Sequence, residues 1–371
     1  MGMDFRRAAS PPEMQAMSGL LRQELEAGAL GLSTGLEYEP GIYSEGSEVV
    51  LLAQQAARRG GRYISHIRSE DRWFEAAVEE IIDIGRITGM PVQISHLKLA
   101  MTRLWGTAPD LLARLDEARA EGIAITADVY PYTYWQSHMM VLLPERDPGD
   151  LAAIDTVMAE LAPPEGILFT DFAPNPALVG RTLQEIADDR GINPSQAFSE
   201  LAQASLTHQA DTGEPGDMII ATSMAEEDVA ALLAWPHANI CTDGSLKDRH
   251  PRGAGSFPRV LGHYAREQRL FPLEVAIQKM TALPAQNMGF SERGRVAPGY
   301  VADLVLLEPD TVTDRATTSD PFLTSAGITA VWVNGQPVLE AGLPTGRYPG
   351  NVIRRRTTLQ GQPAGAPADD P

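Results

Sequence analysis

The chain has 371 residues, 43% hydrophobic and 21% charged, a size and composition that suit one large catalytic domain with a smaller companion. Its formal net charge of −19 excludes nucleic acid and anionic membrane surfaces as expected partners. A single cysteine, Cys241, excludes an intrachain disulfide, and the lack of a signal-type segment or of a membrane-length apolar run of about 18 residues predicts a soluble, cytoplasmic protein.

Strand and helix patterns alternate four times in the first third of the chain. An amphipathic helix is expected over 10–26, with Ser10 as its N-cap and Pro11 at its start. The four expected strands are short apolar runs, which read GALGLSTGL, RYISH, PVQISH and IAITADVYPY. The helices between them are expected over 47–57, 73–89 and 109–122. This alternation indicates a parallel sheet with right-handed crossovers.

The alternation of strands and helices stops after the fourth strand. Residues 133–235 are rich in proline, and we predict an insertion subdomain there, either a lid over the sheet or a decorated crossover. The helix EEDVAALLA and the strand ANICTDGS then resume the pattern, a loop KDRHPRGAGSFPR follows, and two helices complete a barrel domain over 1–290. Residues 291–356 alternate in hydropathy around an Asn-Gly turn and predict a small β domain, whereas 357–371 predict a disordered tail.

Two neighbouring strands end in the same dipeptide, Ser-His. His66 closes the first and His96 the second, with one crossover helix between them. The carboxyl ends of parallel strands form one rim, where active sites of such folds are built. Because neutral imidazole is a common zinc ligand, the two histidines predict a shared zinc ion. A lone strand histidine would more often be a hydrogen-bonded core residue, so the repeated context carries this prediction.

Three further residues are expected on the same rim. Asp243 ends a later strand in the sequence Thr-Asp-Gly and would accept a proton from a metal-activated water, or else serve only as a turn or helix cap. Lys98 would pair with a substrate carboxylate, or else be a solvated rim lysine. Tyr130 would polarise a carbonyl or bind a carboxylate, or else pack before Pro131.

With these residues assembled, the chain resembles the N-acyl-D-amino-acid deacylases (D-aminoacylases) of the amidohydrolase superfamily. The resemblance runs from the first residue to about residue 354 and rests on segments that are specific only in combination. These segments are GALGLSTGLEYEPG, HIRSE, PVQISHLK, TADVYPYT, TDG followed by HPRGAGSFPRVLG, KMTALPAQNMGF and RGRVAPGYVADLVLLEP.

The resemblance implies a TIM (β/α)8-type barrel flanked by a β-sandwich, and zinc-dependent hydrolysis of N-acyl-D-amino acids to a D-amino acid and a carboxylate. It implies His66 and His96 as ligands of one tight zinc ion. Asp243 would be the general acid and base, and a ligand if a second metal ion binds. Positions that contact substrate in such enzymes match Lys98, Tyr130 and Met224.

The sequence also departs from the family pattern. It provides about five of the eight barrel strands and no His-x-His pair, and Cys241 lies in the strand of Asp243 instead of in an early strand. We therefore expect a partial α/β barrel that lacks the family's N-terminal portion, with a complementing fragment or an oligomer as a partner besides the small-molecule substrate. The loop YWQSHMM replaces the run of small residues expected after TADVYPYT, so the substrate pocket should differ.

Two other hypotheses stay open from the sequence. A cyclic amide (dihydroorotase or hydantoinase type) or an isoaspartyl dipeptide would keep the superfamily and change the substrate. Alternatively, the chain is an inactive remnant, because two histidines and an aspartate do not complete the three-ligand site that catalytic zinc normally takes.

Overall fold

The structure is a computed structural model that describes residues 4–245 and 247–355, so the predicted disordered tail lies outside the described residues. At its centre is a five-stranded parallel sheet with the order β1-β2-β3-β4-β8. The strands are β1 (Gly31–Gly35), β2 (Arg62–His66), β3 (Val92–Ile94), β4 (Ile125–Val129) and β8 (Ala238–Ile240). This arrangement confirms the predicted partial α/β barrel of five strands.

The strands pair in register along their length. Gly31 lies opposite Arg62, Tyr63 opposite Val92, and Val92 in turn opposite Ile125. β1 approaches β2 so closely that a Cβ on Gly31 would lie 1.9 Å from the carbonyl oxygen of Arg62, which only glycine avoids. All residues of β3 and of β8 are buried, as expected for strands covered on both faces.

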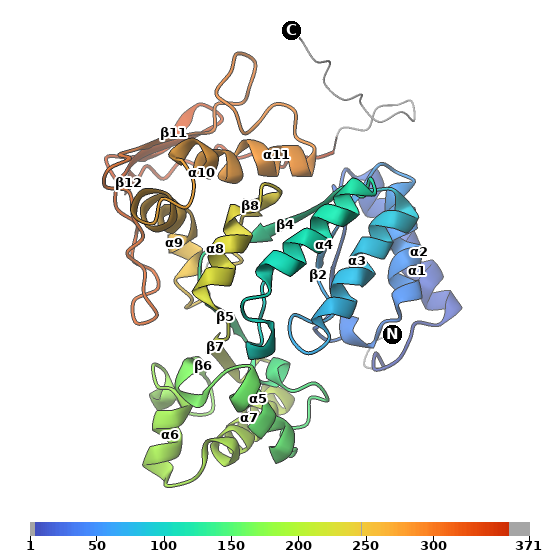
Figure 1. The fold of residues 1–371 in the computed structure, drawn as a ribbon, viewed down its shortest axis with the longest axis vertical. Coiled ribbons are helices and arrows are strands. Elements are labelled where there is room, and N and C mark those ends of the chain that lie inside the picture. The colour runs from blue at the N-terminus through green and yellow to red at the C-terminus, as the bar shows by residue number, and fades with distance from the viewer. Residues whose placement is uncertain (1–3, 246, 356–371) are drawn as a thin grey trace.

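Four helices, one before β1 and three that connect the first four strands, lie along one side of the sheet (Figure 1). They are α1 (Pro11–Glu26), α2 (Gly46–Ala57), α3 (Phe74–Thr88) and α4 (Ala108–Ala120). The predicted Ser10 cap is present: its side chain and that of Glu13 form a capping box at the start of α1. α3 buries an apolar face that includes Ile81 and Ile82, each contributing roughly 1.5–3 kcal/mol, and it ends where Gly89 adopts φ +66°.

The predicted insertion contains a small sheet and three helices, together called the insertion lobe, which lies apart from the other helices in Figure 1. Its strands pair antiparallel in the order β5-β7-β6. The elements are β5 (Tyr134–Ser137), α5 (Leu151–Glu160), β6 (Ile167–Phe172), α6 (Leu183–Arg190), α7 (Pro194–Thr212) and β7 (Asp217–Thr222). The sequence analysis did not find β5 because its pairing partner, β7, lies about 80 residues further along the chain, beyond local periodicity. The predicted bounds of the insertion stay a prediction.

After the lobe, the chain returns to the sheet through α8 (Glu226–Ala234) and β8. The segment expected to be a loop contains a helix, α9 (Arg252–Arg259), so that expectation was wrong. Its glycines had suggested a loop, but Gly255 serves close packing: a Cβ there would lie 2.4 Å from the Tyr132 hydroxyl. The remaining helical segments are η6 (Val260–Glu267), α10 (Leu273–Met280) and α11 (Ala282–Met288).

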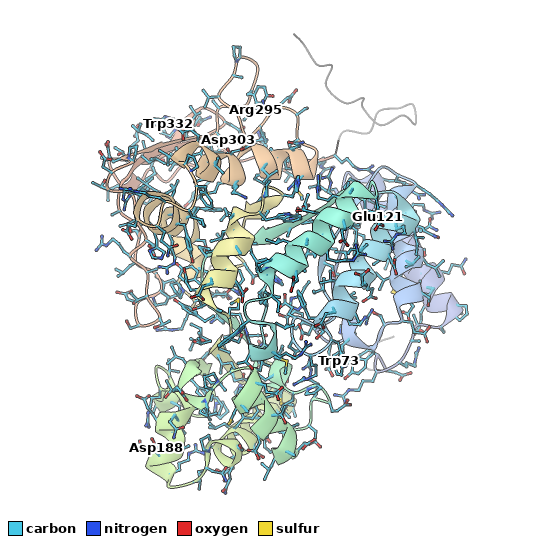
Figure 2. All side chains as sticks on the ribbon, viewed as in Figure 1. Trp73, Glu121, Asp188, Arg295, Asp303 and Trp332 are labelled. Carbon is cyan, nitrogen blue, oxygen red and sulfur yellow. The ribbon has the colours of Figure 1, made fainter. Side chains whose placement is uncertain are left out.

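The C-terminal part is a four-stranded antiparallel sheet with the order β12-β11-β10-β9. Its strands are β9 (Leu304–Leu307), β10 (Ile328–Val333), β11 (Gln336–Glu340) and β12 (Leu343–Pro344). The predicted Asn334-Gly335 turn joins β10 to β11, and both residues have positive φ, as a tight hairpin requires. Figure 2 shows Trp332 in this sheet, Asp303 directly before β9, and Trp73 at the start of α3 on the side toward the insertion lobe. In the part of the chain that the structure describes, no helix is long and apolar enough to cross a membrane.

Candidate metal centre and active site

The two predicted zinc ligands meet at the carboxyl end of the parallel sheet. His66 is the last residue of β2, and His96 follows β3 by two residues. Their ring centroids are 4.7 Å apart, and His66 Nδ1 lies 3.1 Å from His96 Nε2. The strand ends therefore bring together the two imidazoles, as a shared ion requires.

A third donor, Glu70, joins them. Glu70 Oε1 lies 3.0 Å from His96 Nδ1, and Glu70 Oε2 lies 3.7 Å from His66 Nε2. One ligand atom from each of these three residues falls within 4.8 Å of the others. The sequence analysis missed Glu70, although its place four residues after His66 in the segment HIRSE was the available signal.

A row of close polar contacts links Lys98, His96, His66 and Glu37. The buried Lys98 Nζ donates to Glu70 Oε1 at 2.6 Å and lies 2.7 Å from His96 Nδ1. His96 Nδ1 also lies 3.0 Å from Glu70 Oε1, so it faces one group that only donates and one that only accepts, while His96 Nε2 lies 3.1 Å from His66 Nδ1. His66 Nε2 lies 2.8 Å from Glu37 Oε2. Imidazole binds a metal ion in its neutral form, so zinc would take the place of a proton on each ring.

The pKa values of the two glutamates in this cluster, Glu37 and Glu70, are shifted in opposite directions. Burial raises the pKa of Glu37, and the hydrogen bond from His66 only partly opposes that effect. Burial also acts to raise the pKa of Glu70, but His66, Lys98 and His96 together lower it below its usual value. Glu70 therefore carries a negative charge at neutral pH, as a metal ligand must.

Backbone strain at the rim is held by a carboxylate from the next strand. His96 has φ +37°, a left-handed conformation that is uncommon for histidine. Its backbone N–H donates to Asp128 Oδ1 at 2.7 Å, and Asp128 Oδ2 accepts from Gln93 Nε2 at 2.6 Å. Asp128, at the carboxyl end of β4, therefore fixes the turn that presents the His96 ring.

Asp243, the predicted acid and base, lines the same pocket as the zinc ligands. It also has a left-handed backbone, with φ +48°, and its Oδ2 pairs with Arg252 Nη1 at 2.6 Å. Its side chain is about one-third exposed, whereas that of Arg252 is buried. The structure does not include Asp243 in the three-residue donor group, so its predicted role as a metal ligand stays a prediction.

Tyr130 and Met224, the other predicted substrate contacts, are both buried, and neither is among the residues that line the pocket. The Tyr130 ring is 5.6 Å from Lys98 Nζ and 4.9 Å from Arg252 Cζ. Burial raises the pKa of Tyr130, and its hydroxyl has no hydrogen-bond partner among the described residues. Met224 donates its backbone N–H to Thr133 O. Contact of either side chain with substrate stays a prediction.

A pocket with an empty volume of about 450 Å³ joins these groups. Four of the predicted site residues line it: His66, His96, Lys98 and Asp243. Two imidazoles and a carboxylate form a ligand set typical of catalytic zinc, and their 4.8 Å span suits one ion with bonds of about 2.1 Å after small side-chain rotations. Lys98 already places a positive charge among these donors. The residues present therefore fit a zinc ion.

Comparisons with known proteins identify the family of the chain. Residues 195–339 match the model of the Amidohydrolase family. The N-acyl-D-glutamate deacylase of Alcaligenes xylosoxydans xylosoxydans is 40% identical over 356 residues, which cover 95% of this chain and 67% of that protein. The chain belongs to the D-aminoacylase family of amidohydrolases. It spans about two thirds of the length of this family member.

Two solved structures of the D-aminoacylase family have the same fold. One, a D-aminoacylase described as defining a novel subset of amidohydrolases, has a TM-score of 0.83 and 37% identity, covering 95% of this chain and 69% of that chain. The other, N-acyl-D-glutamate deacylase from Bordetella bronchiseptica complexed with zinc and a phosphonate mimic of the tetrahedral intermediate, has a TM-score of 0.81 and 40% identity, covering 95% and 68%.

Proposed function

We propose that the chain is the major part of a zinc-dependent deacylase that hydrolyses the amide bond of N-acyl-D-amino acids. The observation that carries the proposal is one pocket that holds a His66–Glu70–His96 donor set, a carboxylate for proton transfer and a buried lysine. Similarity to N-acyl-D-glutamate deacylase and D-aminoacylase supports the substrate class. We propose one tight zinc ion, with Asp243 as a further ligand if a second ion binds.

When bound to His66, Glu70 and His96, zinc supplies a water whose pKa is lowered to about 7 and polarises the amide carbonyl. Asp243, one-third exposed in the pocket, accepts the proton of the attacking water and then gives it to the leaving amine. Arg252, whose Nη1 lies 2.6 Å from Asp243 Oδ2 and which also lines the pocket, holds that carboxylate in position.

Lys98 binds the carboxylate of the substrate. Its ammonium group is now shared by Glu70 and His96, and it becomes available once these two groups face a cation. The unpartnered hydroxyl of Tyr130, whose ring lies 5.6 Å from Lys98 Nζ, donates a second hydrogen bond to the same carboxylate. The substrate carboxylate would thus have two hydrogen-bond donors, Lys98 and Tyr130, while the scissile amide faces the zinc ligands.

The test uses the chain alone and the chain mixed with a fragment of the family's N-terminal third. We expect about one tightly bound zinc per chain and release of amine from N-acetyl-D-methionine, with N-acetyl-L-methionine as the matched control. Dihydrouracil and hydantoin test the cyclic-amide alternative, and β-aspartyl dipeptides test the isoaspartyl alternative. Zinc well below one per chain in both preparations, together with no amine release, would support the inactive remnant instead.

A further inference from the structure

The pocket has an apolar wall that the proposed chemistry does not use. The wall comes mainly from the start of the insertion lobe and from the residue that follows α5. Its apolar members are Trp135, Val141, Leu142 and Leu161; Ala100 also lines the pocket, and the same segment adds two uncharged polar residues, Gln136 and Ser137. Leu142 and Leu161 are buried, so the wall presents a fixed apolar surface.

The charges around the same pocket are unbalanced. Among the described residues that line it, two are cations, Lys98 and Arg252. Each is already paired with a carboxylate at 2.6 Å, Lys98 with Glu70 and Arg252 with Asp243. The lining carboxylates number four: Glu37, Glu70, Asp71 and Asp243. A zinc ion and Lys98 can accommodate one substrate carboxylate, but no third cation is in place for a second one.

Another arginine, Arg146, is committed to the turn that carries the wall. Arg146 donates to the carbonyl oxygens of Met140, Val141 and Leu143, at 2.9, 2.7 and 2.6 Å, and to that of Glu37 at 2.6 Å. These bonds tie the turn that carries the wall to the rim of the parallel sheet. Arg146 therefore fixes the wall in place and does not line the pocket.

We propose that the pocket selects N-acyl-D-amino acids with uncharged, apolar side chains, and that Val141 and its neighbours in the wall determine this selection. The inference rests on the proposed deacylase function and names its substrate class. Overall similarity alone would favour an acidic substrate, since a relative 40% identical is an N-acyl-D-glutamate deacylase. The wall disfavours that substrate, because a second carboxylate would be desolvated there without a cation to pair with, and the Gln136 amide already donates to Thr170 Oγ1.

The first experiment compares kcat/KM for N-acetyl-D-methionine and N-acetyl-D-leucine with that for N-acetyl-D-glutamate and N-acetyl-D-aspartate. It uses the zinc-loaded chain, with the N-terminal fragment if that is needed for activity. We expect the uncharged substrates to be favoured by at least about 100-fold. Calorimetric titration of the zinc-loaded chain with the same four compounds gives a second readout and should show the same order of affinity.

The second experiment introduces the missing cation. Val141→Lys should raise the preference for D-glutamate over D-methionine by at least about tenfold, whereas the uncharged control Val141→Met, of similar length, should not. Circular dichroism checks that both variants fold. A wild-type preference for acidic substrates, or equal effects of the two variants, would overturn the inference and leave the deacylase proposal standing.

Two further outcomes are decisive in different ways. If selectivity follows the length of the acyl chain and ignores the charge of the side chain, the wall binds the acyl group and the inference is wrong. If none of the four compounds is hydrolysed or bound by the zinc-loaded protein, both the inference and the proposed function fail. The two proposals are therefore separable by the pattern of results.

Discussion

The two ends of the parallel sheet bury charge in opposite ways. At the carboxyl end, Lys98 lies against Glu70 and His96, so each buried charge faces another ionisable side chain. At the amino end, the buried Lys279 donates instead to two backbone oxygens, those of Trp235 at 2.5 Å and Ala238 at 3.0 Å. Burial lowers the pKa of Lys279 to about 8.

This difference indicates that the carboxyl end serves zinc binding and catalysis, whereas the amino end serves the stability of the fold. Side chains at the carboxyl end are held by one another and can be redirected to an ion or a substrate, whereas Lys279 has no described carboxylate partner and only ties α10 to the entry of β8. Substitutions at the carboxyl end should therefore change zinc binding and activity, and substitutions at the amino end should change the free energy of unfolding. Three substitutions and one pH dependence test whether zinc binding depends on the carboxyl end and stability on the amino end.

The largest effect is expected from His96→Ala. Loss of a zinc ligand should remove the tight zinc and lower kcat/KM by more than the 10- to 100-fold that loss of an outer partner typically costs. Zinc content by mass spectrometry and amine release from N-acetyl-D-methionine measure both effects. His208→Ala, in α7 of the insertion lobe, is the matched control and should change neither. Full zinc content in His96→Ala would remove this residue from the metal centre.

At the carboxyl end of the parallel sheet, sequence patterns predicted the features that depend on neighbouring residues along the chain. Five strands were found because each apolar run is short and is followed by a helix pattern, and the strand ends then brought His66 and His96 together. Asp243 was expected on the same rim, and it lines the same pocket. Strand-end position is thus enough to predict which rim a residue occupies.

Other parts could not be predicted because they depend on tertiary contacts. Glu70 follows β2 in a loop, and only the fold shows that it turns back between the two imidazoles. Arg252 was placed in a loop, but it begins a helix whose glycine packs on Tyr132. The apolar wall requires β5, which pairs with a strand about 80 residues away. No local periodicity encodes such contacts.

An intermediate effect is expected from Asp128→Ala, which removes the acceptor of the His96 backbone N–H without removing a zinc donor. Zinc affinity should fall by about 10- to 100-fold, because the left-handed turn at His96 loses its support. Asp128→Asn keeps one oxygen acceptor and should recover most of that affinity. Competition with a chelator measures the zinc affinity of each variant. Equal losses in the two variants would mean that charge, and not the hydrogen bond, is what Asp128 supplies.

At the amino end, Lys279→Met should lower the free energy of unfolding by about 1–2 kcal/mol. The four-atom side chain keeps its packing, but the carbonyl oxygens of Trp235 and Ala238 lose their donor inside the protein. Zinc content and kcat/KM of the folded variant should stay within about twofold of wild type. Urea unfolding measures the change, with the exposed Lys247→Met as control. A large loss of activity in the folded variant would contradict the division between the two ends.

The smallest effect is a pH dependence that belongs to the amino end alone. The pKa of Lys279 is lowered to about 8 in the folded chain from 10.5 in the unfolded chain. Between these values the unfolded chain binds more protons, so the stability of wild type rises with pH through this window. Because Lys279→Met lacks the group, the stability of wild type relative to the variant should increase by about 1 kcal/mol from pH 7 to pH 9.

Urea unfolding of both proteins at the two pH values isolates this change, since every other titrating group contributes equally to each. A constant difference between wild type and variant would mean that the Lys279 ammonium keeps its ordinary pKa despite its burial. The two carbonyl oxygens would then solvate the charge nearly as well as water does. The amino end would in that case stabilise a buried cation as effectively as the carboxyl end does with its carboxylates, and the contrast between the two ends would rest on zinc binding alone.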